Sequence, residues 1–121
     1  MALTKKIKQY QAILLEILEQ EKSDYTGTKY QELEDQIIAD LERNHFQLIR
    51  VGWADDTRCL DIKMQFDIKP DGKIWIQENL TDTAVDDELL KRGVATSDIV
   101  LGMQPLALIG SFRSLRWGEV R

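Results

Sequence analysis

The chain is poor in the residue types that small proteins use for crosslinking and for acid-base chemistry. It contains one cysteine, Cys59, and one histidine, His45, among 121 residues. A single cysteine excludes an internal disulfide and a cysteine pair for a metal ion, which is typical of a reducing compartment. No hydrophobic run approaches membrane-spanning length, and Lys5, Lys6 and Lys8 interrupt the region where a signal sequence would lie. We therefore expect a cytoplasmic protein.

Positive charges are outnumbered by negative ones. Lysine and arginine total 16 against 21 aspartate and glutamate residues, so the net charge is −5. Charges of both signs are interspersed, and few clustered cations are present to release counterions from a phosphate backbone. We therefore expect the isolated protein to bind duplex DNA weakly or not at all. The length predicts one domain, residues 1–121, around a single core.

Apolar periodicity organises the first half of the chain. Apolar residues recur at spacings of three and four over residues 3–21, which predicts an amphipathic helix. Residues 23–30 have turn composition and are interpreted as a connector. From Glu34 the period changes to two, and a short link at residues 43–45 predicts two antiparallel strands, the second being residues 46–53.

The clearest alternation in the chain lies in residues 60–69. The apolar set is Leu60, Ile62, Met64, Phe66 and Ile68, and the polar set is Asp61, Lys63, Gln65, Asp67 and Lys69. This pattern predicts a strand whose apolar set faces the core and whose polar set faces water. A Pro-Asp-Gly turn at residues 70–72 leads to a fourth strand, residues 73–77, which places Trp75 on the polar face beside Lys63 and Gln65.

Helical segments are predicted after the fourth strand. A helix is expected to begin near Thr81 or Asp82 and to end at Gly93, followed by a capped short turn over residues 96–102. Residues 103–121 show no steady period and receive no assignment. The sequence thus predicts an α+β fold with an N-terminal helix, a four-stranded antiparallel meander and C-terminal helices packed on one sheet face.

Few residues are candidates for chemistry. His45 is expected in a solvated turn, because the other interpretation, a general base, finds no nucleophile nearby in the sequence. Cys59 is expected to be a small half-buried side chain rather than a nucleophile. Carboxylates gather at residues 55–56 and 86–88, where turns and the first turn of a helix favour them without a metal ion. We expect no catalytic residue, cofactor or metal site.

Two tryptophans indicate an interaction surface. Trp75 on a wet sheet face exposes a large apolar area unless the C-terminal tail of the chain or a second subunit covers it. Trp53 is the second such residue. The candidate interaction surface therefore comprises Trp75, Lys63, Gln65 and Asp61, together with Trp53. Because exposed apolar anchors on a small domain mark contact surfaces, we expect a homodimer or a higher oligomer.

Three segments resemble the XisI family. They are residues 46–53 (FQLIRVGW), 67–77 (DIKPDGKIWIQ) and 88–102 (ELLKRGVATSDIVLG), and the likeness covers about residues 4–102. XisI proteins are fdxN-element excision controlling factors of filamentous cyanobacteria, implicated with XisH and the recombinase XisF in excision of a DNA element during heterocyst development. The resemblance implies a non-enzymatic accessory protein that acts with an XisH-like partner and a site-specific recombinase complex. It supplies no catalytic residues.

Two other functions stay open beside this one. The first is a metal-dependent, nuclease-like component, and the second is an inhibitor or antidote subunit of a nuclease-like XisH. The family pattern is lost after Gly102, where only Pro105 is recognisable. Codons for residues 113–119, regrouped by one nucleotide, can encode a family-like ending, so we predict a frame-shifted tail. The nucleotide sequence of the gene tests that prediction.

Overall fold

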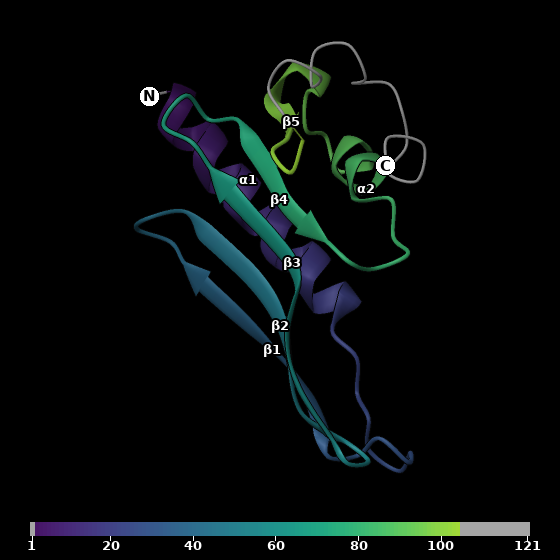
Figure 1. Cartoon of the computed structure of the whole chain (residues 1–121). Helices are drawn as coiled ribbons and strands as arrows, with labels where there is room; N and C mark the ends of the chain where they lie inside the picture. Colours follow the sequence, from purple (N-terminus) through teal and green to yellow (C-terminus); the bar gives the residue numbers. More distant parts are fainter. Residues whose placement is uncertain (1, 105–121) are drawn as a thin grey trace.

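An N-terminal helix lies against a five-stranded sheet in the computed structural model, which describes residues 2–104 (Figure 1). The elements are α1 (Ala2–Glu21), β1 (Leu33–Asp40), β2 (His45–Ala54), β3 (Thr57–Ile68), β4 (Ile74–Asn79), α2 (Val85–Lys91), the 3₁₀ helix η1 (Thr96–Asp98) and β5 (Ile99–Leu101). The strands lie across the sheet in chain order. The predictions for the tail from residue 105 onward fall outside the described residues.

The α+β class is confirmed, but the sheet is mixed instead of four-stranded and antiparallel. Strands β1 to β4 are antiparallel neighbours, whereas β5 pairs with β4 in parallel, with Ile74 opposite Ile99. The prediction of a turn at residues 99–101 was therefore wrong. A strand of three residues that are all buried shows no alternation, so its sequence carries no strand period.

Helix α1 covers one face of the sheet and forms where its apolar period predicts. Its buried side chains are Tyr10, Ile13, Leu14, Ile17 and Leu18. They join a core that includes Phe46, Leu48, Met64, Phe66, Ile74 and Ile76 from the strands. Burying one such side chain stabilises the fold by roughly 1.5–3 kcal/mol relative to leaving it exposed. No described helix has both the length and the apolar character needed to cross a membrane.

Helix α2 begins at Val85, later than the predicted start at Thr81 or Asp82. The side chain of Asn79 explains the difference. Its Oδ1 accepts hydrogen bonds from the N–H and the hydroxyl of Thr81, and its Nδ2 donates to the carbonyl oxygen of Thr83. Short polar side chains stabilise loops as readily as helix starts, so the composition of residues 81–83 was misread as a cap. Packing of Val85 into the core then sets the inward face of α2.

A buried carboxylate joins α1 to the segment that precedes β5. The Tyr10 hydroxyl donates to Asp98 Oδ2 at 2.7 Å, and Lys6 Nζ lies 3.2 Å from the same oxygen. Burial, followed by the hydrogen bond to Asp98, raises the pKa of Tyr10. These contacts hold the start of β5 against the helix.

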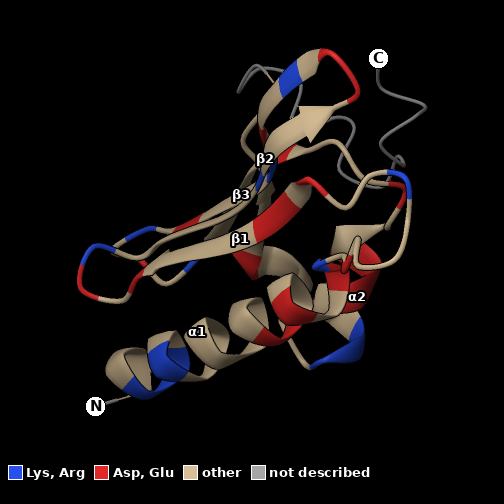
Figure 2. Cartoon of the chain, turned by 90° about the horizontal axis from the view of Figure 1, so that it is seen from below, with Lys and Arg blue, Asp and Glu red and all other residues tan. Residues whose placement is uncertain are grey.

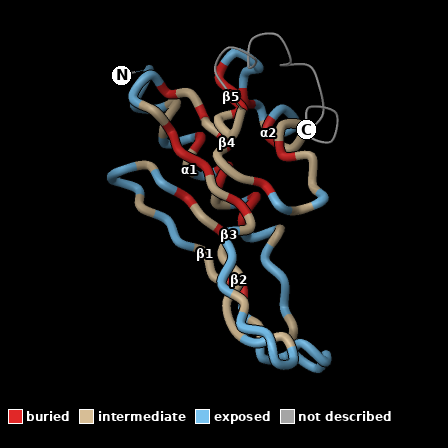
Figure 3. The backbone as a smooth tube through the Cα atoms, in the orientation of Figure 1, coloured by how far each residue is buried: buried red, intermediate tan, exposed pale blue. Residues whose placement is uncertain are grey.

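The outer part of the β2–β3 hairpin projects past the end of α1 (Figure 1). We call this part, residues 49–62, the arm, and the helix-covered remainder of the sheet the base. Figure 3 shows that buried residues concentrate in the base. The connector between α1 and β1 meets the arm at Gly52, where a Cβ would collide with the Glu32 carbonyl oxygen. Only glycine therefore permits this approach, which includes a hydrogen bond from Trp53 N–H to Glu32 O.

Candidate interaction surface

A bulge in β3 decides which side chains share a face of the sheet. Leu48 pairs with Met64, but the next residue, Ile49, pairs with Ile62, so Lys63 is the extra residue. Paired residues share a face and successive residues alternate between faces. One extra residue therefore reverses which of the alternating side chains point toward each face of the sheet beyond the bulge. Met64 faces α1, whereas Ile62 faces away from it.

The predicted core face of β3 is correct only on the base side of the bulge. Met64, Phe66 and Ile68 are buried, whereas Leu60 is 67% exposed and Ile62 is 40% exposed. Apolar and polar residues alternate in the sequence without a break at the bulge. The apolar side chains, however, face α1 on one side of the bulge and the opposite face of the sheet on the other side. The expectation that Leu60 and Ile62 lie in the core was therefore wrong.

The bulge also divides the residues that were predicted to form one wet surface. Asp61 pairs with Arg50 on the α1 side of the sheet. Gln65 pairs with Gln47 on the other side, where the two amide side chains hydrogen-bond at 3.0 Å. Lys63 occupies the bulge between them. Asp61 and Gln65 therefore face opposite sides of the sheet, contrary to the prediction.

The two tryptophans lie in different surroundings. Trp75 is half-buried on β4, with Lys69 Nζ 5.3 Å from the ring centroid. The backbone of Gly102 lies against its ring, since a Cβ there would sit 2.9 Å from Cε3. The segment after β5 thus covers part of Trp75. Trp53 on the arm is 46% exposed, and the guanidinium of Arg58 lies 5.8 Å from its ring centroid.

His45 opens β2 instead of lying in the predicted turn. Its Nδ1 lies 2.8 Å from one oxygen of Asp67, whose other oxygen accepts a hydrogen bond from Gln77. A carboxylate in this position orients an imidazole for acid-base work. The candidate nucleophile Cys59 lies opposite Gly52, roughly 23 Å along β2 by strand rise. The histidine and the cysteine are therefore too far apart to act together.

The carboxylate pairs occupy turn and helix positions. Asp55, with a φ of 55°, and Asp56 form the turn at the arm tip. In α2, Glu88 accepts a hydrogen bond from Arg92 at 2.6 Å, and this bond lowers the pKa of Glu88. Within residues 2–104, no three His, Cys, Asp or Glu side chains are grouped so that they could hold a metal ion.

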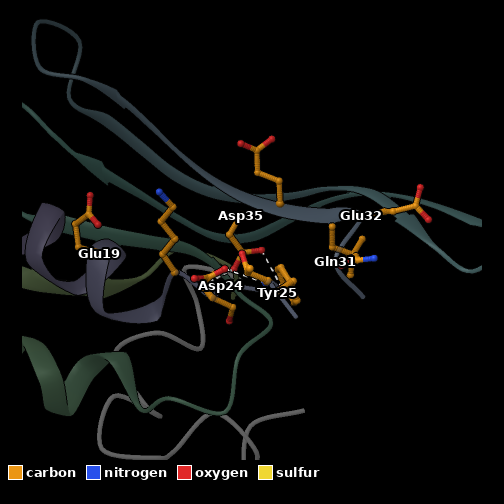
Figure 4. Close-up of a pocket in the computed structure, with 11 residues that line it drawn as sticks. Glu19, Asp24, Tyr25, Gln31, Glu32 and Asp35 are labelled. Atoms are coloured by element: carbon orange, nitrogen blue, oxygen red, sulfur yellow. Dashed lines mark hydrogen bonds between the residues drawn. The ribbon is translucent and has the colours of Figure 1, made fainter. Parts of the chain in front are cut away.

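A cleft of about 670 Å³ separates the end of α1 and the connector from β1 (Figure 4). Acidic side chains that include Glu19, Asp24 and Glu32 line it. Asp35 lies at its base with a fully buried side chain. The residues that line the cleft thus include five acidic residues and one basic residue, Lys22.

Asp35 accepts hydrogen bonds from two segments, the connector and β2. It accepts hydrogen bonds from Ser23 N–H at 2.9 Å, the Tyr25 hydroxyl at 3.0 Å and Arg50 Nε at 3.0 Å. Burial opposes ionisation of Asp35, but the hydrogen bonds from Arg50, Ser23 and Tyr25 outweigh it and hold the pKa below its ordinary value. Asp35 therefore anchors the connector and the arm to β1 and is not a free ligand.

An apolar patch lies on the sheet face turned away from α1. We call it the outer-face patch, and it comprises Ile38, Ile49, Val51, Trp53, Leu60 and Ile62. Ile38 is 48% exposed, and Ile49 and Val51 are half-buried between the neighbouring strands. Figure 2 shows α1 and α2 together on the other side of strands β1 to β3. No described helix therefore covers the patch, and contiguous exposed apolar area of this kind marks contact surfaces.

Comparison with known proteins gives the family. The family model described as XisI protein matches residues 4–109. The chain belongs to the XisI family. The match confirms the resemblance stated from the sequence and extends it beyond Gly102, where the family pattern was expected to end. A comparison with curated proteins found no match.

Two crystal structures of XisI relatives from Anabaena variabilis share the fold. An XisI-like protein is 38% identical, with a TM-score of 0.72 over 90% of this chain and 94% of that chain. The fdxN element excision controlling factor XisI is 29% identical, with a TM-score of 0.73 over 89% of this chain and 96% of that chain. The likeness thus spans most of both chains.

Sequence reasoning missed the outer-face patch of this XisI family member, although β2 contains a signal for it. The apolar residues of β2 are Phe46 and Leu48 at even positions, then Ile49, Val51 and Trp53 at odd positions. The adjacent pair Leu48-Ile49 marks the place where the apolar side of the strand changes. Together with the pattern of β3, this change from even to odd positions indicates that both strands move their apolar side chains to the other face of the sheet at the same place.

Proposed function

We propose that this protein is a non-enzymatic regulatory factor that controls site-specific excision of a DNA element through protein partners. The family match over residues 4–109 carries the proposal, together with a solved relative described as an fdxN element excision controlling factor. The proposed partners are an XisH-like protein and a site-specific recombinase complex, and the proposed location is the cytoplasm.

The chemistry of the described residues supports a binding role. The most buried carboxylate, Asp35, is engaged by Arg50, and Glu88 is engaged by Arg92, so structural ion pairs account for both. The His45–Asp67 pair lies far from Cys59 along the sheet. The outer-face patch, in contrast, offers apolar contact area without a described cover.

Co-purification with an XisH-like protein from the same genome tests this function. We expect the two proteins to form a stable complex, and we expect the chain alone to leave DNA intact with Mg²⁺ or Mn²⁺. Cleavage of DNA by the purified chain in either metal would overturn the proposal in favour of a nuclease-like component. An XisH-like protein that cuts DNA only until this chain is added would assign the antidote role.

DNA binding by the isolated chain provides a second test. At about physiological salt we expect weak or no retention of duplex DNA in a gel-shift assay, because the net charge is −5 and few clustered cations are available. Tight, sequence-selective retention without a partner would show that the chain itself reads DNA, contrary to the proposal.

A further inference from the structure

The outer-face patch is framed by charges of opposite sign on its two flanking strands. Glu34 on β1 pairs with Val51 of β2, and Arg58 on β3 pairs with Trp53 of β2, so both lie on the outer face. Both side chains belong to exposed residues. The central strand β2 contributes Ile49 and Val51 between them. The face therefore runs from acidic through apolar to basic across three strands.

The pattern of charged and apolar residues on this face is complementary to the same face of a second copy of the chain. A two-fold axis parallel to β2 stacks β2 of one copy on β2 of the other and places β1 of each copy over β3 of its partner. Glu34 then faces the strand that carries Arg58, while Ile49 and Val51 meet their own counterparts. Contacts related by a two-fold axis must be self-complementary, and stacked sheets pack about 10 Å apart with nearly aligned strands.

We propose that the outer face of β1, β2 and β3 is the surface through which two copies of this chain associate. Apolar residues from β2 and β3 form the centre of the contact, and the Glu34 and Arg58 side chains pair across it along its two lateral edges. The proposal goes beyond the control of excision, because it concerns the chain in the absence of any other protein.

The size of this face predicts a reversible dimer. Strand spacing and rise give a face of roughly 14 by 23 Å for the three strands, well below the roughly 800 Å² that each partner buries in a typical stable complex. The dimer should therefore dissociate on dilution. Sedimentation equilibrium of the full chain should give a mass of 14.0 kDa when dilute, rising toward twice that value with concentration.

A matched pair of double variants tests the apolar centre. Leu60→Gln with Ile62→Gln removes the two exposed apolar side chains of β3 from the face, and we expect the dissociation constant to rise about tenfold or more. Leu41→Gln with Leu80→Gln is the control, because both leucines are 52% exposed and lie outside the face. The control should change the constant by less than about twofold. Circular dichroism and urea unfolding verify that all four substitutions leave folded chains.

A charge exchange tests the proposed orientation. Glu34→Arg and Arg58→Glu should each weaken association about three- to tenfold, because each sets like charges against one another across the contact. The double exchange should return the constant to within about threefold of the original. Within one chain the two residues lie two strands apart, so recovery reports a contact between copies.

Three results would overturn the proposal. They are a mass of 14.0 kDa at every workable concentration, a dimer that the Leu60 and Ile62 substitutions leave unchanged, and a double exchange that is no better than either single one. A monomer that still binds an XisH-like protein would refute the dimer and leave the proposed function standing. The two proposals therefore fail separately.

Discussion

The base and the arm of this sheet carry their apolar side chains on opposite faces. In the base, Phe46 and Phe66 pack against α1, and the outer face holds the hydrogen-bonded pair Gln47 and Gln65. In the arm, the outer face is apolar and the face toward the helix side carries Arg50 and Asp61. One bulge separates the two patterns. Hydrophobic alternation thus shows that a strand has an apolar face, but not which partner that face meets.

The two regions are also held in place by different interactions. The base is stabilised by burial of apolar area between α1 and the strands. The arm is held by polar contacts to β1 and the connector: Arg50 bonds Asp35 of β1, and its guanidinium lies 5.4 Å from the ring centroid of Tyr25 in the connector. We expect substitutions in the base to change the free energy of unfolding, and those on the outer face of the arm to change association.

The largest expected difference is between two positions on β3. Phe66→Ala removes a side chain with 0% exposure and should lower the free energy of unfolding by about 3–5 kcal/mol. Leu60→Ala removes one that is 67% exposed and should cost less than about 0.5 kcal/mol. Urea unfolding in dilute solution measures both. Equal losses would show that the arm has a core of its own.

Asp35→Asn should give the second largest effect. Loss of the charge that pairs with Arg50 should cost about 2 kcal/mol near neutral pH, less than for a fully buried pair, because Arg50 is 27% exposed. Glu42→Gln, at an 89% exposed side chain, is the control and should cost less than about 0.5 kcal/mol. A neutral result for Asp35→Asn would show that polar contacts do not hold the arm.

The same pair should make stability depend on pH. The pKa of Asp35 is lowered in the folded chain, so its ionised form adds stability that is present above the unfolded pKa of about 3.9. That stability is lost as the pH falls through the lower folded value. Between about pH 5 and 3, the original chain should lose more unfolding free energy than Asp35→Asn. Parallel losses would contradict this assignment.

Tyr10→Phe should have a smaller effect in the base. It removes the hydrogen bond to Asp98 and should cost about 1 kcal/mol, since Lys6 still lies beside that carboxylate. Tyr30→Phe in the connector, where the residue is 38% exposed, is the matched control and should change little. If both variants unfold at the same urea concentration as the original, the Tyr10–Asp98 bond does not contribute to stability.

The smallest effect is expected at Arg58→Ala on the arm. Its contact with the exposed Trp53 ring should contribute no more than about 0.5 kcal/mol to folding in dilute solution. Thermal unfolding in that regime provides the measurement. A loss above about 1 kcal/mol would mean that outer-face contacts fold the arm, which would break the distinction between the two regions.

The sequence predicted the parts of the fold in which a single apolar spacing continues along an element that keeps one face toward the core. Helix α1 and the base half of β3 follow from their spacing, and the β3–β4 turn follows from its Pro-Asp-Gly sequence. Strand β5 could not be predicted, because three buried residues have no period. The start of α2 was misplaced because Asn79 organises the preceding loop through contacts that composition does not distinguish from a cap.

The candidate surface was predicted less well than the fold. Trp53 was named correctly as an exposed residue, but its neighbours were chosen by carrying one alternation through Lys63. The bulge depends on how β3 pairs with β2 in the folded sheet, and nothing in the local composition of residues 60–69 requires it. The faces could be assigned only by comparing both strands, because the signal is the change from even to odd apolar positions at Leu48-Ile49 of β2.

The extra residue at Lys63 also explains how a strand with unbroken alternation in its sequence can present apolar side chains on two opposite faces. A deletion of Lys63 would restore a continuous register with β2 but keep the pairs Leu48–Met64 and Ile49–Ile62, so Leu60 would stay opposite Val51 on the outer face. The amino-acid composition of the strand would barely change. The deletion would instead place Ile62 next to Met64 in the sequence, so β3 would show the same adjacent apolar pair that β2 has at Leu48-Ile49.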